Sequence, residues 1–269
     1  GNDFIFIDNR NGEITSPESL CIQLCDRHYG VGGYGIILIE KSDIADAKMR
    51  IFNRDGSEGR MAGNAIMCVG KYLYDNGIVN KIDITIETGA GIKELHLHLR
   101  DEKVSSVRVN MGKVSLNAKD LPVELGKDKV INEKTKIGSG EYEITCVSVG
   151  NPHCVVFDDY ISRLDLKKIG PVFEHAPIFP DRVNTEFVRY VNKRTLKVRV
   201  WERGIGETMA CGTGACASVV AAVLKGYCKQ DRDIRVKLKG GDLIVNYASD
   251  ETVYLTGNAE LIYEGKLSY

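Results

Sequence analysis

The sequence lacks an excess of charge of either sign and any long hydrophobic run. Lys and Arg total 36 against 37 Asp and Glu, which gives a formal net charge of −1. Nucleic-acid-binding proteins usually carry a basic excess or stripe, so this balance argues against nucleic acid as a partner. No segment approaches the roughly 20 apolar residues that span a bilayer. The opening residues form neither a charged region nor an apolar run, so we expect no signal peptide, no membrane partner and a cytoplasmic location.

Sequence signals for a metal or a nucleotide are also missing. None of the eight cysteines forms a CxxC pair, and no GxxxxGK[ST] motif occurs. We therefore expect no metal site and no cofactor. In a long chain without a signal peptide, cysteines are more often free thiols than disulfides. Cys21 and Cys25 lie four residues apart, which predicts two small buried residues on one helix face.

The 269 residues alternate many short strand patterns with few helical ones. Segments rich in β-branched residues, or alternating in polarity, predict strands at Phe4–Asp8, Ile36–Glu40, Lys81–Glu87, Glu94–Leu99, Val104–Met111, Tyr142–Val149, Cys154–Val156, Thr185–Val191, Lys197–Trp201, Ile234–Leu238, Asp242–Tyr247 and Thr252–Thr256. Apolar periodicity and breaker residues predict helices at Pro17–Arg27, Asn64–Asp75, Ile161–Glu174 and Thr213–Tyr227. This order predicts an α+β fold, mostly β, with one long helix in each half.

A Gly-rich acidic loop followed by an apolar helix occurs twice. Residues 53–65 read NRDGSEGRMAGNA, and residues 202–215 read ERGIGETMACGTGA. Such a repeat predicts two similar domains. We place them at 1–115 and 116–269, with the C-terminal strands as candidates for packing back on the first half. Aligning the Gly-Asn of the first loop with the Gly-Thr of the second places Ala62 opposite Cys211.

The two loops have the chemistry of an anion site. Glycine permits close backbone approach, and the N–H groups of a helix's first turn present partial positive charge. We therefore expect the two helix starts to hold one carboxylate. A thiolate just before a helix is favoured by the same dipole, which predicts a pKa for Cys211 below the usual ~8.5 and a role as base or nucleophile. For one loop alone, a Gly-rich turn with a small buried cysteine is an equal alternative; the duplication favours the anion site.

Motifs along essentially the whole chain point to one family. They are Gly1-Asn2-Asp3-Phe4, Asn53–Cys68, Gly150-Asn151-Pro152-His153, Arg182-Val183-Asn184 and Glu202–Ala217. In this order and spacing they resemble the diaminopimelate epimerases, cofactor-independent enzymes of lysine and cell-wall precursor synthesis. The resemblance implies two pseudo-symmetric α+β domains, each a β structure wrapped around a central helix, with the active site in the cleft between them. It also implies a small-molecule amino-acid substrate and a homodimer.

The same resemblance implies a mechanism with two cysteines on opposite faces of the substrate's α-carbon. One thiolate removes the α-proton and the other thiol delivers a proton from behind, without pyridoxal phosphate. By motif, Cys211 is one of the pair, whereas the partner position holds Ala62, which has no titratable group. Cys68 lies about a turn and a half further along the helix, where core packing is expected. We therefore expect a one-thiol, impaired enzyme, either an engineered form or a natural divergent relative.

The substrate-binding residues also follow from the resemblance. Backbone groups of Gly63, Asn64, Gly212 and Thr213 are implied to hold the reacting carboxylate, Asn2 and Glu202 to position the reacting end, and Asn53, Asn151, Asn184 and Arg203 to grip the distal end. Arginine offers a bidentate fork for carboxylate, and asparagine both donates and accepts. When each residue is considered alone, a structural role in a turn, a surface ion pair or a cap remains an alternative to substrate binding for several of them.

Two departures bear on which substrate is bound. The segment around Tyr34 and the residue Met67 differ from the usual family patterns. We expect interconversion of LL- and meso-diaminopimelate. The alternatives are an epimerase or isomerase of another amino acid, and a non-catalytic amino-acid-binding relative.

Overall fold

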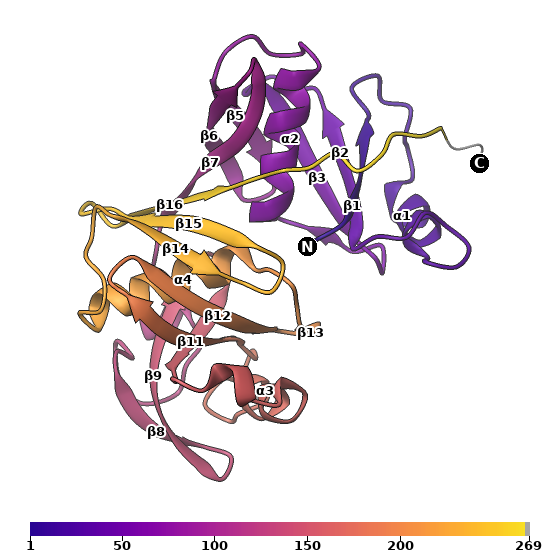
Figure 1. The fold of residues 1–269 in the computed structure, drawn as a ribbon. Coiled ribbons are helices and arrows are strands. Elements are labelled where there is room, and N and C mark those ends of the chain that lie inside the picture. Colours follow the sequence, from indigo (N-terminus) through magenta and orange to yellow (C-terminus); the bar gives the residue numbers. More distant parts are fainter. Residues whose placement is uncertain (267–269) are drawn as a thin grey trace. The chain divides into compact units, whose positions relative to one another are not determined.

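The structure, a computed structural model, describes residues 1–266 and divides into two compact units. We name each after the residue at the start of its long helix. The Ala62 unit comprises residues 3–109 and 256–266, and the Cys211 unit comprises residues 1–2 and 110–255 (Figure 1). Strands with a few helices make up both units, so the prediction of an α+β fold is confirmed.

The Ala62 unit is one sheet with two helices. Its strands are β1 (Phe4–Asp8), β2 (Gly35–Glu40), β3 (Ala47–Asn53), β4 (Glu58–Gly59), β5 (Asp83–Thr88), β6 (Gly91–Arg100) and β7 (Lys103–Lys113), and its helices are α1 (Pro17–Cys25) and α2 (Gly63–Asp75). Their spatial order is β1-β2-β3-β5-β6-β7, with β4 beside β3. The pairs β1–β2 and β3–β5 are parallel, and the other ladders along this order up to β7 are antiparallel.

Helix α2 contacts the sheet through one apolar face. Ile66, Val69 and Leu73 on that face are fully buried. A Cβ added at Gly70 would lie 2.9 Å from Leu95 Cδ2 of β6, so the glycine permits a close approach of helix to strand. As predicted, Cys21 is buried in α1 near Cys25, with the two sulfur atoms 3.6 Å apart.

The Cys211 unit places a helix inside a curved β structure. Its strands are β8 (Glu133–Ile137), β9 (Gly140–Ser148), β10 (Pro152–Phe157), β11 (Asn184–Asn192), β12 (Thr195–Glu202), β13 (Gly206–Glu207), β14 (Asp233–Lys237), β15 (Asp242–Tyr247) and β16 (Thr252–Gly257), and its helices are α3 (Leu166–Glu174) and α4 (Gly212–Leu224). The order is β16-β15-β14-β12-β11-β10-β9-β8, with β13 beside β12. Helix α4 contacts six of these strands, and almost all of its residues are buried, as expected for a helix that is apolar on every side.

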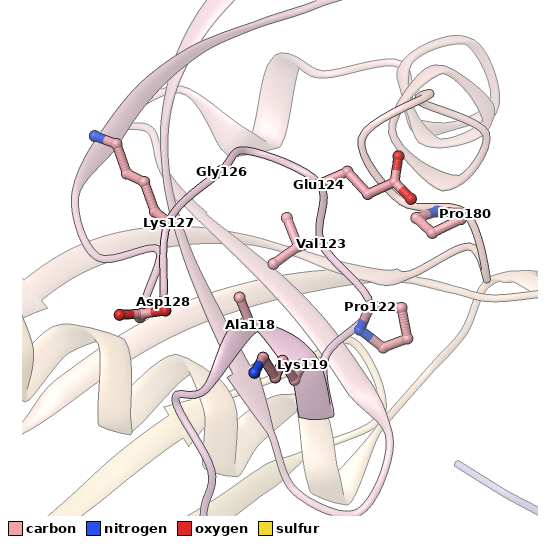
Figure 2. A pocket seen from close by; sticks show the side chains of 9 residues that line it. All are labelled: Ala118, Lys119, Pro122, Val123, Glu124, Gly126, Lys127, Asp128 and Pro180. Atoms are coloured by element: carbon pink, nitrogen blue, oxygen red, sulfur yellow. The ribbon is translucent and has the colours of Figure 1, made fainter.

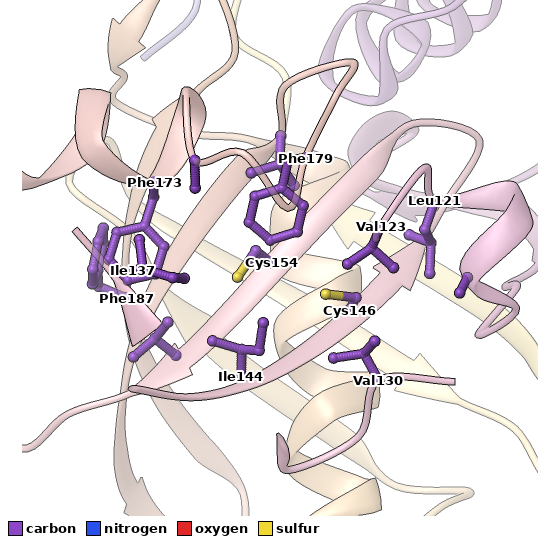
Figure 3. Close-up of a cluster of buried hydrophobic side chains, with 14 of the residues drawn as sticks. Leu121, Val123, Val130, Ile137, Ile144, Cys146, Cys154, Phe173, Phe179 and Phe187 are labelled. Atoms are coloured by element: carbon purple, nitrogen blue, oxygen red, sulfur yellow. The ribbon is translucent and has the colours of Figure 1, made fainter. Parts of the chain in front are cut away.

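A second core of the Cys211 unit lies under α3 (Figure 3). Phe173 of α3 packs edge-to-face on Phe187 of β11, with ring centroids 5.3 Å apart. Cys146 of β9 is paired in register with Cys154 of β10, and both are free thiols in this core. The core includes residues of β10 and β11, and these two strands also carry buried polar residues of the candidate site.

Some predicted element boundaries are wrong. The helix predicted at Ile161–Glu174 is a 3-10 turn at Ile161–Arg163 followed by α3, because Leu164 has an extended backbone (ψ 133°) between the two. The helix predicted to reach Tyr227 ends at Leu224, because Gly226 adopts a positive φ of 80°. Strands β3 and β8 and the two-residue strands β4 and β13 were not predicted from the sequence. In the part of the chain that the structure describes, no helix is long and apolar enough to cross a membrane.

Candidate active site

Helices α2 and α4 start in the same way. Each is 13 residues long, and the residue before each has an extended backbone, with φ −137° and ψ 117° at Ala62 and φ −133° and ψ 113° at Cys211. The first intrahelical bond then runs from Ile66 N to Ala62 O, and from Ala215 N to Cys211 O. The sequence repeat therefore corresponds to a structural repeat at both helix starts. Only the cysteine adds a side-chain cap: its sulfur accepts from Gly214 N at 3.4 Å.

Burial dominates the chemistry of Cys211. The residue is 7% exposed, and Thr213 Oγ1 lies 3.5 Å from its sulfur. Burial, followed by the carboxylates of Glu202 and Glu186, raises the pKa of the Cys211 thiol well above its ordinary value. Hydrogen bonds from Thr213 and the Gly214 amide act in the opposite direction but are outweighed. The predicted low pKa is thus wrong, because desolvation and two nearby negative charges exceed the effect of the helix start.

Glu202 lies at the end of β12, next to this sulfur. Burial raises the pKa of its carboxyl above the ordinary value, and the nearby Glu186 adds to the effect. The Thr208 hydroxyl donates to Glu202 Oε1, and Cys211 provides a further hydrogen bond that favours the charged form. A thiol and a carboxyl group therefore lie side by side with little access to water: the Glu202 carboxylate makes the thiol harder to ionise, whereas the hydrogen bond from the thiol favours the carboxylate.

Sequence reasoning missed a buried pair beside Cys211. His153 of β10 and Glu186 of β11 are both 0% exposed, and His153 Nδ1 lies 2.7 Å from Glu186 Oε1. His153 Nε2 lies 2.9 Å from Asn151 Oδ1, and Asn151 Nδ2 donates to Thr213 Oγ1 at 3.3 Å. One available signal was a glutamate in the otherwise apolar start of the strand predicted at Thr185–Val191.

Two of the residues that the family resemblance implies to bind the distal end of a substrate, Asn184 and Arg203, make hydrogen bonds within the protein. Asn184 Nδ2 donates to Pro152 O at 2.8 Å, and its Oδ1 accepts from Arg203 N at 2.9 Å. The exposed Arg203 side chain donates to Asp181 O at 3.0 Å. Asn184 thus fixes the backbone of Arg203, while the guanidinium remains at the surface.

The buried Glu174, which was not predicted, anchors the loop after β12. One of its carboxylate oxygens accepts from Gly204 N at 2.9 Å, and the other accepts from Trp201 Nε1 at 2.7 Å. Glu174 comes from α3, so this helix holds the segment that carries Glu202 and Arg203. No short-range sequence pattern links positions 27 or 30 residues apart, which explains why the contact was missed.

In the Ala62 unit the predicted residues cluster around the start of α2 and the end of β3. Asn53 Nδ2 donates to Ser57 Oγ at 3.0 Å, and the Asn53 carbonyl accepts from Cys21 Sγ at 3.0 Å. Gly63 and Asn64 form the first turn of α2. Cys68 Sγ lies 3.6 Å from Asn64 O, and burial raises its thiol pKa to about 11, which leaves it protonated at neutral pH.

An open pocket of about 320 Å³ lies elsewhere on the Cys211 unit (Figure 2). Its walls come from the segment 118–128 and Pro180, and they include both lysine and acidic side chains. None of the predicted site residues lines it. Within residues 1–266, no group of three His, Cys, Asp or Glu side chains is placed to hold a metal ion.

Comparison with known proteins places the chain in a family. A family model of diaminopimelate epimerase matches residues 1–117 and 145–262. The diaminopimelate epimerase of Acetivibrio thermocellus is 47% identical over 268 residues, covering 99% of this chain and 95% of that protein. That of Methanococcus maripaludis is 48% identical over 268 residues, covering 99% and 96%.

Solved structures show the same fold at low sequence identity. A phenazine biosynthesis protein of the PhzF family from Bacillus anthracis has a TM-score of 0.69 at 16% identity, covering 96% of this chain and 90% of that one. A probable proline racemase from Agrobacterium radiobacter has a TM-score of 0.65 at 18% identity, covering 91% and 79%. On the strength of the family model and the full-length relatives, the chain belongs to the diaminopimelate epimerase family of isomerases.

Proposed function

We propose that this protein acts on diaminopimelate, and that Cys211 exchanges a proton with the α-carbon of the substrate. The observation that carries this proposal is the thiol at the start of α4, with the Gly214 amide and the Thr213 hydroxyl beside its sulfur. Both groups favour the thiolate that forms when the sulfur gives up its proton. Proton transfer by a group positioned in this way typically contributes 10²–10⁴-fold to a rate.

The protonation state of Cys211 decides whether the residue acts first as an acid or as a base. Because its pKa is raised, the thiol predominates at neutral pH and is ready to donate a proton. To act as a base, the sulfur must first become a thiolate. A substrate ammonium group near Glu202 would favour that state, because it would offset the negative charge that now opposes ionisation. We therefore assign Glu202 to the amine of the reacting centre, with Asn2 beside it.

The backbone of the two helix starts supplies the carboxylate site in this proposal. In α4 the first intrahelical bond is donated by Ala215 N, so the amides of Gly212 and Thr213 precede the helical ladder. Gly63 and Asn64 hold the equivalent places in α2. Such N–H groups bind carboxylates without any charged side chain.

We assign the distal amino-acid group to a polar set from both units. Arg203 provides the charge for the distal carboxylate, and Asn53, Asn151 and Asn184 provide amide donors and acceptors. Asn184 contributes partly by holding the backbone of Arg203, because its Oδ1 accepts a hydrogen bond from Arg203 N. The predicted halves, 1–115 and 116–269, thereby each contribute to the binding of one small-molecule substrate.

Ala62 limits the activity of this chain in the proposed mechanism. Inversion needs an acid–base group on each face of the α-carbon, and a methyl side chain cannot carry a proton. We propose that position 62 is the place of the second thiol, so that the present sequence is an impaired, one-thiol form of a cofactor-independent epimerase. From the family resemblance we further propose that the protein is cytoplasmic and forms a homodimer. Sedimentation of the purified protein tests the proposed dimer.

The test is restoration of the second thiol. The Ala62→Cys protein is expected to convert LL-diaminopimelate to the meso isomer at least about 10²-fold faster than the present chain. Adding Cys211→Ala to that variant should remove the gain. An Ala62→Ser protein is the matched control, because its hydroxyl is similar in size but a far weaker acid and base. If Ala62→Cys remains as slow as Ala62→Ser on diaminopimelate, the proposed function is wrong.

A further inference from the structure

A chain of side-chain contacts links the buried Glu186 to Cys211. It runs from Glu186 Oε1 to His153 Nδ1 (2.7 Å), from His153 Nε2 to Asn151 Oδ1 (2.9 Å), from Asn151 Nδ2 to Thr213 Oγ1 (3.3 Å) and from Thr213 Oγ1 to Cys211 Sγ (3.5 Å). The residues come from β10, β11, the turn before β10 and the first turn of α4. A chain of side chains from three separate elements therefore ends at one sulfur atom.

The amide of Asn151 gives this chain a direction. Its nitrogen donates to Thr213 Oγ1, so its oxygen faces His153 Nε2, and Nε2 must carry a proton. The Thr213 oxygen already accepts this bond, which leaves its own hydrogen available for Cys211 Sγ. When the sulfur loses its proton and becomes an acceptor, a donor is thus already aimed at it.

The other histidine nitrogen faces a carboxylate. The Nδ1–Oε1 distance of 2.7 Å lies in the range of charge-assisted N–H···O bonds. A carboxylate at Nδ1 and an amide oxygen at Nε2 are both acceptors, so this geometry suits a ring that carries both protons. Among residues 1–266, His153 is the basic side chain within ion-pair distance of Glu186, and Glu186 Oε2 is buried without a hydrogen-bond partner. A buried carboxylate needs a cation close by, and His153 is the side chain placed to provide it.

The backbone of α4 is adapted to this carboxylate. A Cβ added at Gly214 would lie 2.6 Å from Glu186 Oε1 and 3.3 Å from Cys211 Sγ. Only a residue without a side chain lets the helix start approach both groups. Glu186 is therefore built into the site, although nothing in the proposed chemistry requires it to touch the substrate.

We propose that Glu186 is a positioning residue that holds His153 as an imidazolium, so that the donors from His153 through Asn151 and Thr213 all point toward the Cys211 sulfur. Neither Glu186 nor His153 exchanges a proton with the substrate in this scheme. Their effect on Cys211 rests on the function proposed above, whereas the protonation state of His153 does not. The two claims are therefore tested separately.

The direct test is nitrogen-15 NMR of the histidine side chains in the unaltered chain at neutral pH. The His153 signals are assigned by their loss in His153→Asn. Two nitrogen shifts of the protonated type, each coupled to a bound hydrogen, are the expected result. One nitrogen without a proton would overturn the proposal, and this measurement requires no variant at Glu186 to fold.

A second measurement compares Glu186→Gln with Thr185→Val. Gln keeps the size of the side chain but removes the charge, so His153 should become neutral, and exchange of the substrate α-hydrogen with solvent should slow by about 10- to 100-fold with little change in KM. The Thr185 hydroxyl is buried and unpartnered on the same strand, so Thr185→Val should change neither readout. An imidazolium that persists in Glu186→Gln, or equal slowing in both variants, would overturn the proposal. Absence of all exchange in the unaltered chain would instead count against the proposed function alone.

Discussion

Ala62 and Cys211 hold the same backbone position in two different units. Their φ and ψ angles agree within a few degrees, and each precedes a 13-residue helix. Cys211 Sγ accepts from the amide three residues ahead, that of Gly214, and the equivalent amide after Ala62 is that of Ala65. A cysteine placed at 62 would therefore find a capping donor already in position, with no change in the backbone.

Gly70 of α2 and Gly214 of α4 should respond differently to an added methyl group. In Gly214→Ala the new Cβ would meet a buried, ion-paired oxygen at 2.6 Å, whereas in Gly70→Ala it would meet the end of the Leu95 side chain at 2.9 Å. We expect Gly214→Ala to lower the free energy of unfolding by about 1–3 kcal/mol. Gly70→Ala should change it by less than about 1 kcal/mol, because Leu95 can move and alanine favours the helix. Urea unfolding of both variants checks this order, and equal losses would contradict it.

The raised pKa of Cys211 predicts the pH dependence of its reactivity. Only the thiolate reacts with an alkylating agent, and a thiol with a raised pKa is mostly protonated at neutral pH. The alkylation rate of Cys211, followed by peptide mass spectrometry, should therefore rise about tenfold per pH unit from pH 7 to pH 9. A rate that is already constant at pH 7 would show that the thiolate dominates there.

Glu202→Gln should increase that rate at a fixed pH of 8. The substitution removes a negative charge that raises the pKa of Cys211, while its amide oxygen can still accept from Thr208. Glu207→Gln is the control, because Glu207 lies on the same loop and is ion-paired with Arg199. Equal acceleration by both variants would mean that loop mobility, rather than charge, controls the sulfur.

Arg203 should contribute to ligand affinity more than to stability. Its side chain is exposed and donates a hydrogen bond to the Asp181 carbonyl. Arg203→Ala should weaken meso-diaminopimelate binding by about 1.5–3 kcal/mol in calorimetric titration, through lost charge-assisted bonds. Arg235→Ala, which removes an exposed arginine paired with Asp242, should leave the affinity unchanged. Unchanged affinity in Arg203→Ala would remove this residue from the site.

Ligand binding should protect two segments together. If the helix starts of both units contact one ligand, amides in Asn53–Asn64 and in Glu202–Thr213 should exchange with deuterium more slowly when meso-diaminopimelate is present. Strand β6 (Gly91–Arg100), which carries none of the proposed binding residues, is an internal reference and should not respond. Protection of one segment alone would argue against a substrate shared by the two units.

The repeat and the helix starts were predictable from sequence because they depend on local patterns. Glycine, a small polar residue and an apolar run define a helix start within a few positions, and both helices begin within one residue of the prediction. The break at Leu164 and the edge strand β8 carry no comparable local pattern. The order of the strands depends on pairings between distant segments, which the residue pattern alone does not specify.

The electrostatics of the site could not be predicted from local spacing. The expectation for Cys211 considered only its place at a helix start, whereas its pKa depends on burial and on Glu186 and Glu202, which come from other strands. Likewise, His153 was visible only as part of a motif, and its partner Glu186 lies 33 residues away in the sequence. Burial and long-range charge are properties of the packed chain.

The measurement that tests the central claim most directly is solvent-deuterium exchange by the unaltered chain. With Cys211 as the only acid–base thiol, and facing the D-centre by family resemblance, meso-diaminopimelate should slowly gain deuterium at that centre without matching formation of the LL isomer, and the LL isomer should bind but exchange little. Cys211→Ala should abolish this exchange. Inversion by the unaltered chain at an ordinary enzymatic rate, or exchange that survives Cys211→Ala, would contradict the account.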